Sequence, residues 1–456
     1  MLKFKELIKI ETVEIKNPMQ ETTGDLSFYT DTRTHNGEQV FIAIEGANFK
    51  PLSFINKVKA QIIICEDNEY NREIINDNKD RTFIIVKSVI NSLREVANLI
   101  SKKFQANGGV LIAVSGSNGK TTTKEMLFHI LSESGENVVC TQKNNNNHIG
   151  VPITLFQINA DTKYCITELG SNHPGEIKYL VDMVEPSCGI CTNIGETHLE
   201  FFDNVENVFK EEGYLLKYLA ENNKTLFVNA DDDFLEVYKS AESALSFGFS
   251  KDVDYSFDLD ANSFKLIIDG ETLDYTNQNI TGKHNKLNLL VAAAICHNLK
   301  IPNDKVASAI ASFKPTRNRS EWIELDGRKI FLDAYNANPS SMKAALLAFK
   351  EKCIEMNLKK DEFAIILGDM NELGKDAARY HEELGKFCSQ NGFLNMYFVG
   401  NFAHSYNKGC NYIGTEFLTT DQLKKKMQDI VTLHKAMFIK GSRSLQLEST
   451  VDITLC

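Results

Sequence analysis

The residues with the clearest chemical meaning form a short run of small and hydroxyl side chains around one lysine. The run Gly116-Ser-Asn-Gly-Lys-Thr follows an apolar segment, residues 110–114, and precedes a helical pattern of apolar residues. Backbone N–H groups in such a loop bind phosphate, a lysine adds positive charge, and a threonine hydroxyl can bind Mg²⁺. The run therefore predicts a nucleotide phosphate site made by Gly116, Asn118, Gly119, Lys120, Thr121 and Thr122.

This loop departs from the general phosphate-loop pattern. That pattern has a glycine five residues before Gly119, where this chain has Val114. The loop is thus a short variant. A strand-to-helix turn with incidental glycines is the alternative interpretation.

Two candidate metal ligands come directly after predicted strands. Glu168 ends the segment 163–168, and His198 follows the segment 188–194. Ligands of open α/β sheets lie beyond the carboxyl ends of the strands, and nucleotide-bound Mg²⁺ needs donors nearby. We therefore expect Glu168 and His198 near the phosphates, although a lone histidine is more often structural.

Amide side chains make up further candidate sites. Asparagines and one histidine follow two of these strands, and two asparagines lie three residues apart at a helix start. Amides both donate and accept hydrogen bonds, so they suit a polar ligand. Polar surface turns and a helix cap are the alternatives. The candidates are Asn146, Asn147, Asn172, His173, Asn285 and Asn288.

The elements that position these residues suggest three domains in 456 residues, at about 150 residues each. Residues 1–86 are predicted to form a small α/β unit. Thr32 and Arg33 lie in a loop of this unit, which is either a phosphate-binding turn or a solvated turn. Residues 87–314 hold the phosphate loop and mostly parallel strands. Short antiparallel strands are expected over residues 244–280.

Residues 315–456 alternate strands and helices as a small doubly wound α/β domain. Strands are expected at 329–333, 363–367, 396–399 and 436–440, and helices at 341–352, 380–390 and 420–432. Polar loops follow three of these strands, so the carboxyl edge is a predicted ligand face. Its candidate residues are Asp333, Asn336, Asn338, Ser442 and Arg443.

Composition excludes several classes of protein. The hydrophobic content is 43%, the formal net charge is −11, and the ten cysteines are scattered. The charge argues against general nucleic-acid binding, and the sequence lacks an apolar run of about 18 residues that a membrane span needs. A reduced, cytoplasmic protein is expected. Cys188 and Cys191 have metal-ligand spacing, but their segment reads as a buried strand, so we predict packing.

Taken together, these motifs resemble the Mur ligase family over nearly the whole chain. The short phosphate loop is shared by Mur ligases and folylpolyglutamate synthases, and the pieces Asn336-Ala-Asn-Pro339 and Leu367-Gly-Asp-Met370 point to one branch of the Mur ligases. Further pieces of the resemblance are Gly150-Val-Pro152, Glu168-Leu-Gly-Ser-Asn-His-Pro-Gly-Glu-Ile177, Thr192-Asn-Ile-Gly-Glu-Thr-His-Leu-Glu200, Gly282-Lys-His-Asn-Lys-Leu-Asn288, Asn318-Arg-Ser320 and Lys440-Gly-Ser-Arg443.

The resemblance implies a reaction. ATP phosphorylates the terminal carboxylate of UDP-N-acetylmuramoyl-tripeptide, and the amine of D-alanyl-D-alanine attacks the acyl phosphate. The product is the pentapeptide precursor of peptidoglycan. It also implies an N-terminal UDP-binding domain, a central ATPase domain, a C-terminal Rossmann-like ligase domain that closes over the ATP, and two Mg²⁺ ions. A monomer is expected.

The resemblance also assigns roles. Lys120 stabilises the phosphates; Thr121 with Glu168 holds one Mg²⁺, and Glu168 with His198 holds the second. Asn285 and Asn288 match the adenine-side motif, and the remaining matches to the nucleotide contacts are Arg319, Asp333 and Asn336. Lys120, Glu168, His198 and Arg319 are the expected catalytic residues.

One position departs from the family. Many Mur ligases carry a carbamylated lysine about fourteen residues after the metal-binding histidine, where this chain has Glu212. A glutamate supplies a similar charge without modification, so Glu212 is a candidate metal ligand. A modified Lys210, or a solvated helix face, is the alternative.

Two other functions stay open from the sequence. One is another ATP-dependent amide ligase with the same loop, either a different Mur ligase or a folylpolyglutamate synthase. The other is a catalytically inactive nucleotide-binding scaffold, which would not need Lys120, Thr121, Glu168 and His198 together.

Overall fold

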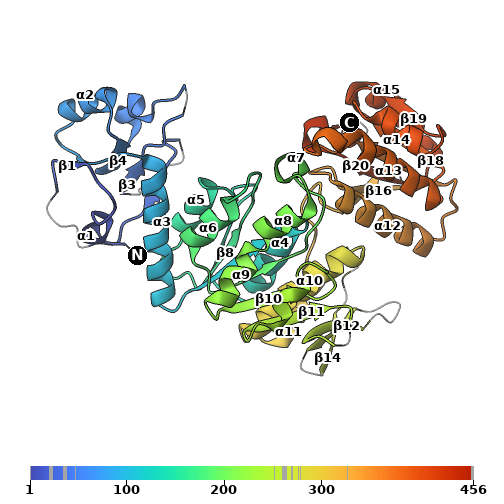
Figure 1. Ribbon diagram of the computed structural model, residues 1–456, viewed down its shortest axis with the longest axis horizontal. Coiled ribbons are helices and arrows are strands. Elements are labelled where there is room, and N and C mark those ends of the chain that lie inside the picture. The colour runs from blue at the N-terminus through green and yellow to red at the C-terminus, as the bar shows by residue number, and fades with distance from the viewer. Residues whose placement is uncertain are drawn as a thin grey trace.

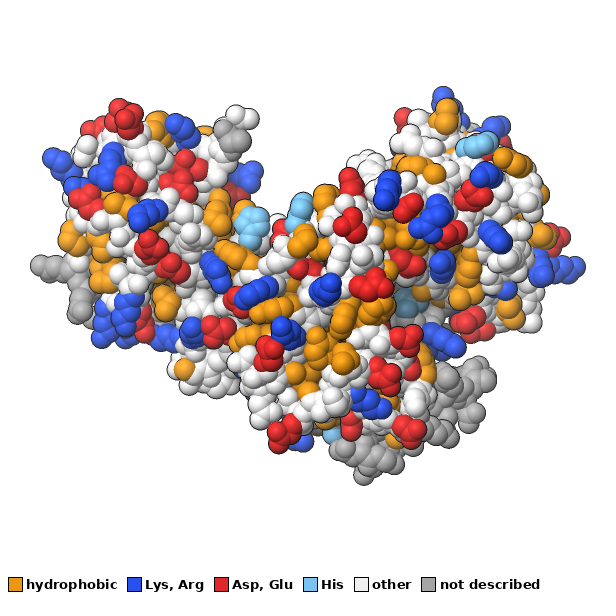
Figure 2. Space-filling view, viewed as in Figure 1, with side chains coloured by type: hydrophobic (Ala, Val, Ile, Leu, Met, Phe, Trp, Pro, Cys, Tyr) orange, Lys and Arg blue, Asp and Glu red, His pale blue; other side chains and the backbone are white. Residues whose placement is uncertain are grey.

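The computed structural model of the chain contains three β-sheets that follow one another along the sequence. It describes residues 2–19, 24–33, 39–46, 48–250, 252–258, 264–268, 271–275, 277, 279–325 and 327–452. Figure 1 shows the first and third sheets at opposite ends, with the central sheet between and below them. Figure 2 shows the hollow that this arrangement leaves between the two ends.

The first sheet has the strand order β1-β5-β4-β3-β2 and is parallel except for β1. Its central strands are buried along their length, as is typical of parallel strands covered on both faces. The strands are β1 (Glu14–Lys16), β2 (Phe28–Tyr29), β3 (Val40–Ile42), β4 (Ile62–Glu66) and β5 (Thr82–Val86), and the helices are α1 (Phe4–Leu7), η1 (Pro51–Lys57) and α2 (Glu69–Asp77).

The central sheet has nine strands in the order β14-β13-β12-β11-β10-β9-β6-β8-β7. Leu111 and Ala113 of β6 lie in one hydrophobic cluster, and Ile112 and Val114 lie in another, so helices cover both faces. The strands are β6 (Val110–Ser115), β7 (Val138–Cys140), β8 (Tyr164–Glu168), β9 (Cys188–Cys191), β10 (Thr225–Asn229), β11 (Ala244–Gly248), β12 (Tyr255–Asp258), β13 (Phe264–Ile268) and β14 (Glu271–Tyr275).

The helices around this sheet begin with α3, whose first turn is capped by the Ser88 side chain. Their bounds are α3 (Val89–Ala106), α4 (Lys120–Glu133), α5 (Gly150–Phe156), α6 (Glu176–Val184), α7 (Leu199–Phe202), α8 (Val205–Glu212), α9 (Tyr214–Glu221), η2 (Glu236–Ser240), α10 (Lys283–Asn298) and α11 (Asn303–Ser312).

The expectation of antiparallel strands over residues 244–280 was partly wrong. β11 pairs in parallel with β10, and β12 pairs in parallel with β11; only β13 and β14 continue antiparallel. The short η2 connection between β10 and β11 provides the crossover that a parallel pair requires.

The third sheet has the order β15-β16-β20-β17-β18-β19 and is parallel except for the β15–β16 hairpin. The four strands and three helices expected here are confirmed, whereas β15 and β19 were not anticipated. The elements are β15 (Glu321–Leu325), β16 (Arg328–Leu332), α12 (Pro339–Glu355), β17 (Phe363–Gly368), η3 (Gly374–Asp376), α13 (Ala377–Gln390), β18 (Asn395–Val399), α14 (Ala403–Gly409), β19 (Thr415–Phe417), α15 (Thr420–Leu433), β20 (Ala436–Lys440), η4 (Arg443–Leu445) and α16 (Ser449–Asp452).

Two helices connect the three parts through shared hydrophobic packing. The buried face of α3 lies in one cluster with side chains of the first and the central sheet. Leu199 and Phe202 of α7 pack in the cluster of the third sheet with Phe331 and Leu373. The central region thus contributes side chains to the core of the third.

Cys188 and Cys191 lie on opposite faces of β9, one in each cluster of the central sheet. Burial raises the pKa of the Cys188 thiol to about 12. This placement supports the packing interpretation. No helix in the described part of the chain is long and apolar enough to span a membrane.

Candidate functional site

The carboxyl ends of the central and third sheets face one cavity of about 770 Å³. Loops after β6, β7, β8, β9 and β10 form one wall, and residues after β16 and at the end of β20 form the other. This is the edge at which open α/β sheets bind ligands. The sequence-predicted residues on its wall are Asn118, Gly119, Lys120, Thr121, Thr122, Asn146, Asn147, Glu168, Asn172, His173, His198, Asn285, Asn288, Arg319, Asp333, Asn336 and Asn338.

Two glycines shape the phosphate loop at the start of α4. Gly116 has φ +120°, and a Cβ there would lie 2.2 Å from the Thr192 hydroxyl oxygen. Gly119 has φ +82°, and a Cβ would lie 2.7 Å from Oδ1 of Asn288. Only glycine fits this backbone without displacing Thr192 or the Asn288 side chain. The loop and α10 therefore approach each other closely, which brings Asn288 beside the predicted phosphate site.

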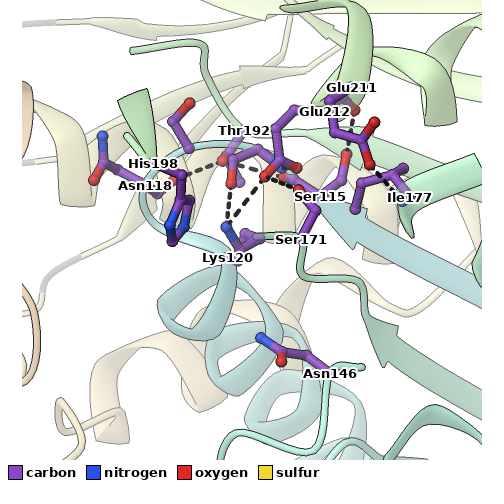
Figure 3. A network of polar contacts seen from close by, with 12 residues as sticks. Ser115, Asn118, Lys120, Asn146, Ser171, Ile177, Thr192, His198, Glu211 and Glu212 are labelled. Atoms are coloured by element: carbon purple, nitrogen blue, oxygen red, sulfur yellow. Dashed lines mark hydrogen bonds and ion pairs between the residues drawn. The ribbon is translucent and has the colours of Figure 1, made fainter. Parts of the chain in front are cut away.

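The Lys120 side chain points toward the Glu212 carboxylate, as Figure 3 shows. It donates a hydrogen bond to the Gly116 carbonyl and lies 3.7 Å from Oε1 of Glu212. Its side chain is 14% exposed, so the charge remains accessible from the cavity. Lys120 therefore has an internal counter-ion while it lines the cavity.

Glu212 is completely buried at the end of α8 and does not line the cavity. Its Oε2 accepts a hydrogen bond of 2.8 Å from the Gly116 N–H, and its Oε1 lies 3.5 Å from the Ser171 hydroxyl. Both oxygens thus face the phosphate loop and its surroundings. A direct role for Glu212 as a metal ligand stays a prediction.

Glu168 is the best-placed carboxylate for a cation. It is 2% exposed; its Oε1 accepts a hydrogen bond of 3.0 Å from Asn146, and its Oε2 has no hydrogen-bond partner among the described residues. A buried carboxylate oxygen without a partner is costly unless a ligand satisfies it. Since Glu168 and Thr121 both line the cavity, these two residues could hold Mg²⁺ there.

The cation would need ligands beyond the protein. Within the described ranges, no group of three His, Cys, Asp or Glu side chains is arranged to hold a metal. Mg²⁺ usually takes one or two carboxylates and completes its shell with phosphates and water. A nucleotide-bound ion held by Thr121, Glu168 and His198 therefore stays a prediction.

His198 meets a residue from the third region. Its Nδ1 hydrogen bonds to Oε2 of Glu372, which lies in the loop after β17. The imidazole beside it lowers the pKa of Glu372 below its usual range. Glu372 was not among the predicted site residues, although its loop is one of the polar loops expected after the strands of this region.

Two of the predicted amide sites already have structural partners. Oδ1 of Asn147 accepts hydrogen bonds from the N–H groups of Ile149 and Gly150, next to the start of α5. The backbone N–H groups of Asn172 and His173 donate to Glu176. All three residues line the cavity, where contacts to substrate stay predictions.

The adenine-side candidates lie at the start of α10. Asn285 is 5% exposed and donates to the Thr281 carbonyl at 3.0 Å, and Asn288 is 6% exposed beside Gly119. His284 lines the same part of the cavity, and burial lowers the pKa of its imidazole to about 4. A neutral imidazole therefore lines this part of the cavity.

The third region adds charged groups to the opposite wall. The Asp333 carboxylate accepts a hydrogen bond of 2.5 Å from the Lys440 ammonium and one of 3.1 Å from the Ser320 N–H. Lys440 also donates a hydrogen bond of 2.9 Å to the Asn336 carbonyl. The Arg319 guanidinium lies 3.8 Å above the Tyr335 ring. Lys440 was missed as a candidate, although it is the last residue of β20 and ligands of open α/β sheets lie at the carboxyl ends of the strands.

The two walls touch at the phosphate loop. The Asn118 side chain donates to Ser340 at 3.0 Å and accepts from Asn338 at 2.8 Å. Asn338 also caps α12 by accepting from the Ser341 N–H. The N-terminus of α12 therefore meets the loop directly, so the two halves of the site are in contact.

Some described candidates lie elsewhere. Gly116 belongs to the loop but does not line the cavity. Thr32 and Arg33 belong to the first sheet region, where Arg33 pairs with Asp31 and its side chain is 85% exposed. Ser442 is buried against Asp369, and Arg443 pairs with Glu448. Neither Ser442 nor Arg443 lines the cavity, because the chain turns away after Lys440.

Two family models match the chain over much of its length. The Mur ligase middle domain matches residues 114–296, and the Mur ligase, glutamate ligase domain matches residues 318–432.

Curated relatives align with almost the entire chain, and those described here carry one name, UDP-N-acetylmuramoyl-tripeptide–D-alanyl-D-alanine ligase. The protein from Buchnera aphidicola subsp. Acyrthosiphon pisum is 30% identical over 430 residues, 91% of this chain and 90% of the relative. The one from Escherichia coli (strain K12) is 28% identical over 439 residues, 92% of each. The one from Bacillus subtilis (strain 168) is 28% identical over 446 residues, which are 96% of this chain and 94% of the relative.

Solved structures share the fold. MurF from Acinetobacter baumannii has a TM-score of 0.82 at 24% identity, covering 96% of this chain and 95% of that one. MurF ligase from Thermotoga maritima in complex with ADP has a TM-score of 0.76 at 23% identity, covering 94% and 97%. The chain therefore belongs to the Mur ligase family, in the branch of the UDP-N-acetylmuramoyl-tripeptide–D-alanyl-D-alanine ligases.

Proposed function

We propose that this protein joins D-alanyl-D-alanine to UDP-N-acetylmuramoyl-tripeptide at the expense of ATP. The observation that carries the proposal is the cavity between the central and third regions. One wall holds the phosphate loop and Glu168, whose Oε2 has no partner among the residues described, and the other holds Arg319 and Lys440. A site with basic groups on both walls suits two anionic reactants that must be brought together.

The reaction has two steps. A terminal carboxylate oxygen of the tripeptide attacks the γ-phosphorus of ATP, and the bond to the β–γ bridging oxygen breaks, which releases ADP. The amine of D-alanyl-D-alanine then attacks the acyl phosphate carbon, and inorganic phosphate leaves as the amide forms. The amine loses one proton in this step. No covalent bond to the protein is required.

The side chains contribute position and charge. We assign Lys120 and the loop N–H groups to the β- and γ-phosphates, Asn285 and Asn288 to the adenine side, and Arg319 with Asp333 and Asn336 to phosphate and ribose contacts. Donors fixed before the reaction stabilise charge that develops during phosphoryl transfer without reorganising. The contact between Asn118 and Asn338 supports a site assembled from both walls.

Magnesium fits the donors on the wall. Thr121 and Glu168 would hold one ion and Glu168 with His198 a second, with Glu212 as a further proposed ligand. Such an ion neutralises phosphate charge. Asn146 would keep Glu168 oriented through its hydrogen bond of 3.0 Å.

Substrate contacts are proposed for the remaining candidates. Thr32 and Arg33 would bind the UDP end from the first sheet region. Four residues of the central region would contact the peptide along the cavity: Asn146, Asn147, Asn172 and His173. Three residues of the third region would also contact the substrates: Asn338, Ser442 and Arg443. We further propose that the protein works as a monomer in the cytoplasm.

The test is phosphate release measured with each substrate alone and with both. Release that requires ATP, UDP-N-acetylmuramoyl-tripeptide and D-alanyl-D-alanine together, with the mass of the UDP-pentapeptide, is the expected result. Activity with a single amino acid in place of the dipeptide would indicate a different Mur ligase. ADP binding without any phosphate release would indicate an inactive scaffold.

A further inference from the structure

The predicted metal ligand His198 is held by a carboxylate from another part of the molecule. Its Nδ1 hydrogen bonds to Oε2 of Glu372, which is 174 residues further along the chain. The His198 side chain is 14% exposed and lines the cavity, whereas the Glu372 side chain is 44% exposed. The ring therefore lies between the cavity and the third region.

The backbone around this contact is held in an unusual conformation on both sides. His198 has φ +51° and Glu372 has φ +61°, both in the left-handed region that non-glycine residues rarely adopt. Between them, the Glu200 N–H donates to the Glu372 carbonyl at 3.0 Å. Strained residues persist when the surrounding structure fixes them, and they often occur at functional sites.

Packing keeps the Glu372 loop in place. Asp369 accepts hydrogen bonds from the Asn401 and Phe402 N–H groups, at 2.7 and 2.9 Å. The Met370 N–H donates to Nε2 of the buried His381 at 2.9 Å. The start of the loop that carries Glu372 is thus anchored on the residues before α14 and on α13, and the Glu372 carboxylate approaches His198 from this support.

The chemistry of imidazole explains what this contact does. When Nδ1–H donates to a carboxylate, Nε2 keeps its lone pair and the ring orientation is fixed. Histidines that bind metals commonly have such a partner, and the partner raises the basicity of the ligand.

We propose that Glu372 is a positioning residue that sets the tautomer and direction of His198 for metal binding. The third region then completes the metal site through one hydrogen bond without contacting the ion itself. This inference rests on the proposed metal role of His198. It goes beyond the proposed reaction because it makes metal affinity depend on contact between two regions of the chain.

The first experiment measures the Kd of Mn²⁺ by electron paramagnetic resonance, with ADP present and no other substrate. Glu372→Ala should raise the Kd by about 10- to 100-fold, the usual effect of losing such a partner. Glu372→Gln keeps an acceptor for Nδ1–H without the charge and should fall between the wild type and Glu372→Ala. An unchanged Kd in Glu372→Ala would overturn the proposal.

Glu200→Gln is the matched control. Glu200 is an exposed carboxylate two residues from His198, and only its backbone N–H contacts Glu372. The control should therefore keep the wild-type Mn²⁺ affinity. A loss as large as that of Glu372→Ala would show that general charge near the site explains the effect, and would also overturn the proposal.

A second readout does not depend on metal. With histidine labelled by ¹⁵N, His198 should show protonated Nδ1 and unprotonated Nε2 in the wild type, and a mixture of tautomers in Glu372→Ala. The same tautomer distribution in both proteins would contradict the proposal. Failure of the proposed ligase reaction would appear separately, as absence of the UDP-pentapeptide in a wild type that still binds Mn²⁺.

Discussion

Replacement of Glu168 by glutamine should change stability and metal affinity in opposite directions. In the absence of metal, the carboxylate is 2% exposed and one of its oxygens has no partner among the residues that the structure describes. The substitution removes this buried charge but keeps an oxygen for the hydrogen bond from Asn146. A residue that serves only the fold would lose stability when changed, whereas a metal ligand without its metal should gain it.

The size of each effect follows from the burial. An unsatisfied buried polar group costs about 1–3 kcal/mol, and the new amide group retains part of that cost, so we expect a gain of about 1 kcal/mol. For a domain of about 200 residues this raises Tm by about 2–4 °C. One unit charge about 4 Å from a divalent cation contributes about 8 kcal/mol at an effective dielectric constant near 20. Desolvation of the carboxylate offsets much of this, so about 3 kcal/mol, or about 100-fold in Kd, should remain.

The assay combines thermal unfolding in a chelator with Mn²⁺ titration in the presence of ADP. Glu176→Gln is the control, because Glu176 lines the same cavity but its carboxylate already accepts two backbone hydrogen bonds. The control should leave the Mn²⁺ Kd within about twofold of the wild type, since its charge is already compensated. A lower Tm for chelated Glu168→Gln, or an unchanged Kd, would refute the reasoning.

Three further predictions concern other groups of the site. Lys120→Met should lower kcat by at least about 100-fold, because a fixed positive charge at the phosphates is lost. The rate of ADP release measures kcat, and Lys124→Met serves as a comparison for effects on folding. Glu212→Gln should lower kcat strongly if the buried carboxylate is essential, and near-normal turnover would reject the proposed role. His284 has its pKa lowered to about 4, so its neutral form stabilises the fold fully above about pH 6.5, and the contribution disappears as the pH falls toward 4. His284→Gln should therefore reduce the loss of stability between pH 7 and pH 5 by on the order of 1 kcal/mol in denaturant titrations, and an identical pH dependence would contradict this.

The phosphate loop, Glu168 and His198 were predictable because local rules determine them. An apolar strand, a glycine-rich turn and a helix start specify the loop, and the strand-end rule places Glu168 and His198 at the same edge. The helices of the third region were predictable from apolar periodicity, and α12 begins slightly earlier than expected because Asn338 caps it and Pro339 suits its first turn.

The contacts between distant segments were not predictable. Glu372 reaches His198 only because α7 packs into the core of the third sheet, and no local pattern specifies that packing. Glu212 was expected near a metal, but its depth behind the loop depends on how α8 lies against Gly116. Ser442 and Arg443 were chosen over Lys440 because the sequence does not show where the chain turns away from the cavity.

The packing of α7 also bears on how the chain acquires its structure during synthesis. Leu199 and Phe202 belong to a core whose other members include Phe331 and Phe438, which are translated much later. At about 5–20 residues per second, these two apolar side chains wait roughly 6 to 26 seconds for Phe331 and roughly 12 to 47 seconds for Phe438. Until the third sheet is synthesised, this short hydrophobic segment lacks most of the core into which it packs.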